Sequence, residues 1–150
     1  MDELDRIDRQ IDIDASAERV WSLITRPGWW INTGQINPDQ EVDRQDGLDV
    51  VHHPDYGDFR IRTVDVDPPR YVSFRWLSDP TEENKEPSTL VEFWIDERPG
   101  GVTLRVSESG FSTLSPDRDK WLVRREENVE GWEKELAVAR EYVESGVGAR

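Results

Sequence analysis

The residue whose type and position most suggest chemistry in this sequence is Glu108. Val102, Leu104 and Val106 alternate with polar residues, which predicts a strand with one apolar face, and Glu108 continues that apolar side. Its carboxyl group is therefore expected inside the protein. A buried carboxylate either pairs with a cation or has a raised pKa, and a raised pKa would suit a general acid or base.

Three arginines could neutralise this carboxylate. Arg60 and Arg62 have the same parity as Val64 and Val66, so they should face the same side of the strand unless a β-bulge reverses it. Arg125 lies on the apolar stripe of a predicted C-terminal helix. A buried charge needs a partner. We therefore predict that Glu108 is ionised, pairs with at least one of these arginines, and orients a ligand or supports the fold rather than transferring protons.

Other candidates are aromatic or can bind protons. His52 and His53 are neighbours on a predicted strand and point to opposite faces, so they cannot chelate one metal ion together. His52 either faces a cavity inside the protein, where it could donate or accept a proton, or is a residue at the end of a strand beside a turn. The expected ligand-binding residues are Trp30, His52, Arg60, Arg62, Trp76, Glu108, Phe111, Trp121, Arg125 and Asn128, with Glu108 as the one catalytic candidate.

The same residues have a purely structural interpretation. Glu108 and an arginine could form a salt bridge that closes one end of the sheet, while the tryptophans fill a core that has few aliphatic side chains. Trp132 is expected in that core, beside a Gly131 that would let a strand approach the helix closely. Trp94 has the opposite parity to its apolar neighbours and is expected on the outer face of the sheet. There it would either contact another protein chain or be covered by the aliphatic part of an arginine side chain.

Composition excludes several classes of function. The net charge of −14 disfavours binding to nucleic acid and to anionic membranes, and no apolar run approaches the ~18 residues that cross a bilayer. The sequence has no cysteine, no zinc signature, no phosphate-binding glycine loop and no nucleophile elbow. No cofactor or metal is expected. We expect a single domain over residues 1–150, cytoplasmic and either monomeric or homodimeric.

Local patterns predict the elements that position these residues. A first strand over 6–13 leads into a helix over 15–24 capped by Ser16, followed by a short second helical turn at 29–31. A long helix follows Ser115 or Asp117, ends at Gly146, and has an apolar stripe at 121, 125, 128, 132, 136, 139 and 143. Between the helices, strands are predicted at 41–43, 48–53, 58–67, 71–76, 89–98 and 102–109.

Five short motifs in this order resemble the SRPBCC (START-like) superfamily, and within it the family similar to the activator of Hsp90 ATPase homologue 1 (AHSA1-like). They cover nearly the whole chain. The resemblance implies an α+β helix-grip fold, with a curved antiparallel sheet of six to seven strands around a long C-terminal helix and two short helices after the first strand. The motifs are the segment 11–21, Trp29-Trp30, the double proline within 66–76, the segments 101–106 and 109–111, and Gly131-Trp132.

The resemblance implies function less directly, because members of the superfamily bind lipids, sterols, polyketides or hormones, act as cyclases or hydrolases, or serve as co-chaperones. We expect a binding protein for a hydrophobic or aromatic small molecule, held in the cavity between sheet and helix. The first alternative is an enzyme of the cyclase or hydrolase type, with Glu108 as general acid or base. The second alternative is a protein-interaction module of the co-chaperone type.

Overall fold

Seven antiparallel strands form one curved sheet, and a long helix lies against it. The computed structural model describes residues 4–32, 34–80, 82 and 84–145. The order of strands across the sheet is β1-β7-β6-β5-β4-β3-β2. The elements are β1 (Arg6–Ile13), α1 (Ala17–Ile24), β2 (Glu41–Gln45), β3 (Leu48–His53), β4 (Gly57–Asp67), β5 (Tyr71–Leu77), β6 (Ser88–Arg98), β7 (Gly101–Ser109), the 3₁₀ helix η1 (Phe111–Thr113) and α2 (Arg118–Glu144).

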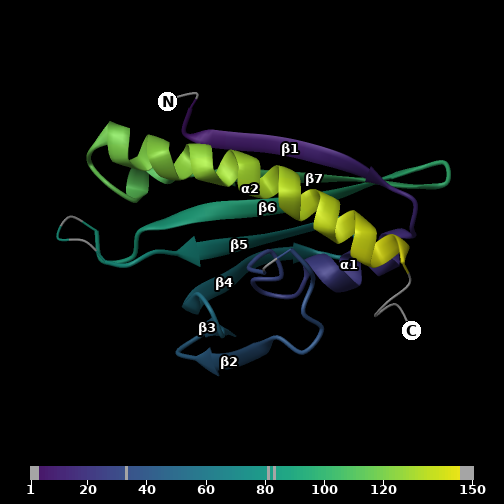
Figure 1. Cartoon of the computed structure of the whole chain (residues 1–150), viewed down its shortest axis with the longest axis horizontal. Coiled ribbons are helices and arrows are strands. Elements are labelled where there is room, and N and C mark those ends of the chain that lie inside the picture. The colour runs from purple at the N-terminus through teal and green to yellow at the C-terminus, as the bar shows by residue number, and fades with distance from the viewer. Residues whose placement is uncertain (1–3, 33, 81, 83, 146–150) are drawn as a thin grey trace.

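Helix α2 lies along the β1–β7 side of the sheet, and α1 lies beside its C-terminal end (Figure 1). The Asp117 side chain caps α2 by accepting from the backbone N–H of Asp119, and Ser16 caps α1 by accepting from that of Arg19. Both caps agree with the sequence prediction. The predicted end of α2 at Gly146 lies outside the described residues. This α+β helix-grip arrangement confirms the expected fold class.

The predicted second short helix is wrong. Residues 25–30 form a succession of turns, in which the N–H of Trp29 bonds to the carbonyl of Arg26 and that of Ile31 to the carbonyl of Gly28. Gly28 has φ of +71°, and a Cβ there would lie 2.7 Å from Cγ2 of Val51. A left-handed residue in the middle of the segment stops a helix from continuing, so the two following tryptophans turn into the core instead.

A β-bulge decides which side chains of β4 face the core. The register against β5 shifts between Thr63 and Val66, so the alternation seen at the valines does not extend backwards. Ile61 is fully buried opposite Trp76. Arg60 and Arg62 therefore lie on the outer face of the sheet, which is the alternative that the parity argument left open.

An aromatic cluster packs in the core between the sheet and α2. Trp30 packs 5.4 Å from Phe74, 5.7 Å from Phe93 and 5.8 Å from Trp132, measured between ring centroids. Trp132 is 2% exposed, which confirms its predicted place in the core. The tryptophans thus occupy volume that an open cavity would need, and what remains is a smaller hollow at the edge of the cluster.

Candidate functional site

Glu108 is buried deep between β7 and α2. Its register opposite Ile7 on one side and Val91 on the other places it among apolar residues, and it is 1% exposed. Burial raises the pKa of the Glu108 carboxyl, while its hydrogen bonds and the charge of Arg124 act in the opposite direction. The predicted inward orientation of Glu108 is therefore correct.

Neutral groups surround the Glu108 carboxyl. Thr89 Oγ1 donates to Oε2 at 2.6 Å, while Asn128 Nδ2 and Trp132 Nε1 donate to Oε1 at 2.9 Å and 2.8 Å. These three donors come from β6 and from two successive turns of α2. The carboxyl thus links the sheet to the helix without a cation in hydrogen-bonding reach among the described residues.

The predicted ion pair between Glu108 and an arginine is wrong. The β4 bulge turns Arg60 and Arg62 outward, and Arg125 points from α2 toward the start of β1, where it is bound to backbone. The groups that these arginines bind are the Ser78 carbonyl for Arg60, Glu86 for Arg62, and the Arg6 carbonyl together with Glu126 for Arg125.

A shallow hollow of about 90 Å³ opens beside this carboxyl, and we call it the tryptophan notch. Trp30 and Trp76 meet there edge to face, with ring centroids 5.7 Å apart. Asn128 connects the notch to Glu108, because its side chain lines the notch and its amide donates to that carboxyl. The lining residues are Trp30, Trp76, Asn128, Gly131, Trp132 and Glu135.

Glu135 is a second carboxyl group with an altered proton affinity, and it lines the notch directly. Burial raises its pKa to about 7, while a hydrogen bond from Asn32 Nδ2 at 2.6 Å acts in the opposite direction. Glu135 was not among the site residues predicted from the sequence. The signal was its spacing of four and seven residues from Gly131 and Asn128, which places the three along one side of the helix.

Gly131 lines the notch and adds no side chain to it. Apart from its chain neighbours and the backbone of its own helix, no heavy atom lies within 4 Å of a Cβ built at this position, so the predicted close approach of a strand to the helix is wrong. Glycine in a helix interior costs roughly 0.5–1 kcal/mol relative to alanine. Packing does not require glycine here, and its effect is to leave the hollow between Trp76 and Glu135 unfilled.

His52 lies away from the notch. It is on the outer face of β3, where Nδ1 contacts Asp58 at 2.6 Å and Nε2 contacts Asp43 at 2.8 Å. These hydrogen bonds raise the pKa of the His52 imidazole. The neighbouring Val51 points into the core instead. The structure therefore agrees with the strand-end alternative for His52.

Of the remaining predicted residues, Trp30, Trp76 and Asn128 meet at the notch, while Phe111 and Trp121 do not. Phe111 is fully buried in η1, and Trp121 lies under Arg118, whose guanidinium carbon is 5.7 Å from the ring centroid. The predicted outer position of Trp94 is correct, and Arg105 covers its ring at 4.9 Å.

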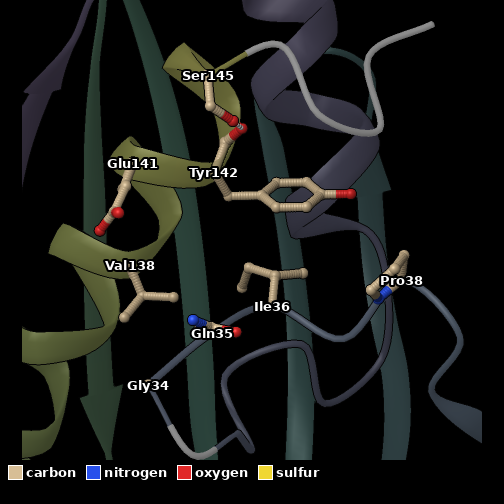
Figure 2. A pocket seen from close by; sticks show the side chains of 8 residues that line it. All are labelled: Gly34, Gln35, Ile36, Pro38, Val138, Glu141, Tyr142 and Ser145. Atoms are coloured by element: carbon tan, nitrogen blue, oxygen red, sulfur yellow. Dashed lines mark hydrogen bonds between the residues drawn. The ribbon is translucent and has the colours of Figure 1, made fainter.

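A larger groove runs between the end of α2 and the segment 34–38 (Figure 2). It has a volume of about 370 Å³, and the Tyr142 ring lies across it beside Ile36 and Pro38. No sequence pattern pointed to this groove.

Among residues 4–32, 34–80, 82 and 84–145, no group of three or more potential metal ligands comes together, and no helix is long and apolar enough to cross a membrane.

Comparison with known proteins agrees with this architecture. No curated protein matches the sequence. The solved structure of protein MLL2253 from Mesorhizobium loti is 17% identical, with a TM-score of 0.69 over 93% of this chain and 97% of that one. The Aha1 dimer from Colwellia psychrerythraea is 14% identical, with a TM-score of 0.66 over 95% and 98%. CalU16 from Micromonospora echinospora is 20% identical, with a TM-score of 0.60 over 92% and 73%.

At these identities the solved structures support the fold alone. The sequence model of the activator of Hsp90 ATPase homolog 1-like proteins matches residues 14–144, which includes both carboxyl groups and every residue of the notch. The chain therefore belongs to the activator of Hsp90 ATPase homolog 1-like family.

Proposed function

We propose that this protein binds a hydrophobic or aromatic small molecule, and that the tryptophan notch recognises one end of it. The observation that carries the proposal is Gly131, a helix-interior glycine with open space where its side chain would be. Sites of this kind are mainly apolar with a few convergent polar groups. Here the aromatic walls are tryptophan rings, and the polar groups are the Asn128 amide and the Glu135 carboxyl.

The size of the notch limits what it can hold. A cavity of 150 Å³ is known to take benzene, and the notch measures about 90 Å³. An alkyl end or the edge of one ring fits, and the rest of the molecule would lie over the surface of α2. The expected ligand is therefore held at one apolar end.

Filling the notch from within tests this proposal. Gly131→Leu would put a side chain into the hollow, Gly131→Ala would leave most of it open, and Glu130→Leu would put the same side chain on an exposed position of the helix. Wild type and variants would be screened against aromatic and acyl compounds by tryptophan fluorescence and thermal shift. Native mass spectrometry would detect any ligand that co-purifies.

We expect Gly131→Leu to weaken binding at least tenfold while the two control variants bind as wild type does. If no compound binds to wild type, or if Gly131→Leu binds equally well, the notch is a packing defect at the edge of the aromatic cluster and not a recognition site.

A second candidate function, general acid–base catalysis, is favoured by Glu135. A general acid or base works best with a pKa near the working pH, and the pKa of Glu135 is raised to about 7. Glu108 suits this role less, since three donors enclose a carboxyl that is 1% exposed. The test is the rate of p-nitrophenyl acetate hydrolysis as a function of pH. A rate that changes with an apparent pKa near 7 in wild type, and no longer does so in Glu135→Gln, would support catalysis. A pH–rate profile unchanged by this substitution would refute it.

A further inference from the structure

We propose that the tryptophan notch binds a methylated ammonium group, so that the ligand of this protein is an organic cation. The proposal rests on the function proposed for the notch, and it adds the charge of the end group that enters it. Three aromatic rings and one carboxylate line the same hollow, from Trp30, Trp76, Trp132 and Glu135. Aromatic rings around a cation are a recurrent means of recognising quaternary ammonium groups.

Glu135 has no counter-ion within the part of the chain that the structure describes. The one group that bonds to it there is the neutral amide of Asn32, which donates to Oε1 at 2.6 Å. The other oxygen, Oε2, accepts no hydrogen bond from the described residues and is not one of the buried atoms without a partner, so it is open to solvent. An ionised Glu135 therefore leaves a negative charge beside the rings that a bound cation would neutralise.

Trp76 is the ring that a ligand can touch most easily. It is half-buried, whereas Trp30 and Trp132 are 5% and 2% exposed. Trp30 lies against both of the other rings, with its centroid 5.7 Å from that of Trp76 and 5.8 Å from that of Trp132. A cation within about 6 Å of an indole centroid is attracted by the electrons of the ring. A cation seated against Trp76 gains this attraction while its charge is balanced by Glu135.

A methylated ammonium suits these walls better than a primary ammonium. A primary ammonium has three N–H donors and holds its hydration water tightly, and indole rings have no oxygen that could accept from it. Methyl groups on the nitrogen spread the charge over an apolar surface, which can pack against Trp76 and occupy the open space beside Gly131. The net charge of −14 also attracts cations to the protein as a whole.

Choline is the probe, and its matched control is 3,3-dimethylbutan-1-ol, a neutral molecule of the same shape with carbon in place of the charged nitrogen. Binding would be followed by calorimetry and tryptophan fluorescence at pH 8, where most of Glu135 is ionised because its pKa is about 7. We expect wild type to bind choline about tenfold more tightly than the neutral alcohol, since the two differ in charge alone. Ethanolamine, whose ammonium has no methyl groups, should bind more weakly than choline.

Three variants locate the bound charge. Glu135→Gln keeps the shape of the side chain and should weaken choline binding about tenfold, because the attraction between opposite charges is lost, while the neutral alcohol binds as before. Glu130→Gln makes the same change at an exposed position of the same helix and should alter the binding of neither probe. Gly131→Leu fills the notch and should weaken the binding of both.

Proton release gives a second measurement. Choline has no proton that titrates near pH 7, so a proton released on binding comes from the protein. A bound cation favours the ionised form of Glu135, whose pKa is raised to about 7 by burial. The other residues that line the notch are neutral, as is Asn32. Calorimetry at pH 7 in buffers of different ionisation enthalpy should therefore show proton release in wild type and none in Glu135→Gln.

This inference and the proposed function can fail separately. Equal binding of choline and the neutral alcohol, both weakened in Gly131→Leu, would overturn the inference and leave the proposed function standing. A preference for choline that persists in Glu135→Gln or in Gly131→Leu would place the cation elsewhere on the acidic surface and would also overturn it. If neither probe binds, the inference is wrong, and the screen of aromatic and acyl compounds decides the proposed function independently.

Discussion

Replacing Glu135 by glutamine keeps the shape of the side chain and removes its charge, which makes the effect of burying this carboxyl measurable. The pKa of Glu135 is raised from 4.5 to about 7 in the folded protein because burial disfavours the ionised form. A raised pKa means that the group stabilises the fold at low pH and that this stabilisation is lost as pH rises through 7. At pH 8 the folded protein holds an ionised carboxylate that would be better solvated in the unfolded chain.

The magnitude follows from the two pKa values. At about 1.4 kcal/mol per pH unit, the difference between 4.5 and about 7 corresponds to roughly 3–4 kcal/mol. Glu135 is only partly buried, and water screens part of this energy. We therefore expect Glu135→Gln to be about 1–2 kcal/mol more stable than wild type at pH 8 and about equal to it at pH 4.5. The glutamine carbonyl can still accept the hydrogen bond from Asn32.

Urea unfolding followed by tryptophan fluorescence at pH 4.5 and pH 8 measures this difference. Glu130→Gln, an exposed change on the same helix, is the control and should alter the free energy of unfolding by no more than a few tenths of a kcal/mol at either pH. If the gain of Glu135→Gln is the same at both pH values, or if this variant is less stable than wild type at pH 8, burial does not raise the pKa of Glu135 and the reasoning is refuted.

Three further predictions concern the core. Glu108→Gln should cost less than about 1 kcal/mol at pH 7 in thermal unfolding, because the amide can keep all three hydrogen bonds by donating to Thr89; a loss of 3 kcal/mol or more would show that the ionised carboxylate is required. Trp132→Ala should lose about 3–5 kcal/mol in urea unfolding, and a nearly unchanged midpoint would remove this residue from the core. Gly101→Ala should lower the melting temperature by several degrees, since its Cβ would clash with the Ile13 carbonyl oxygen, and an unchanged melting temperature would contradict the β1–β7 register.

Most of the fold could be predicted from the sequence because its signals are local. Alternation of apolar residues predicted strands whose bounds agree with the structure to within two residues, and Ser16 and Asp117 marked the starts of the two helices. Each of these signals depends on neighbours in the chain and on the steric rules of one element. The prediction of a short helix at 29–31 was wrong because it also used only local signals. The left-handed conformation of Gly28 and its close approach to Val51 depend on a distant strand.

The sequence by itself determined that Glu108 is buried, because strand alternation decides which side a residue faces. Only the tertiary structure decided what surrounds this carboxyl. Its partners lie 19 to 24 residues away, and the register of β6 and the rotation of α2 select Thr89, Asn128 and Trp132 over the arginines. Open space at Gly131 and the burial of Glu135 likewise depend on how the helix lies on the aromatic cluster, and no local pattern specifies that packing.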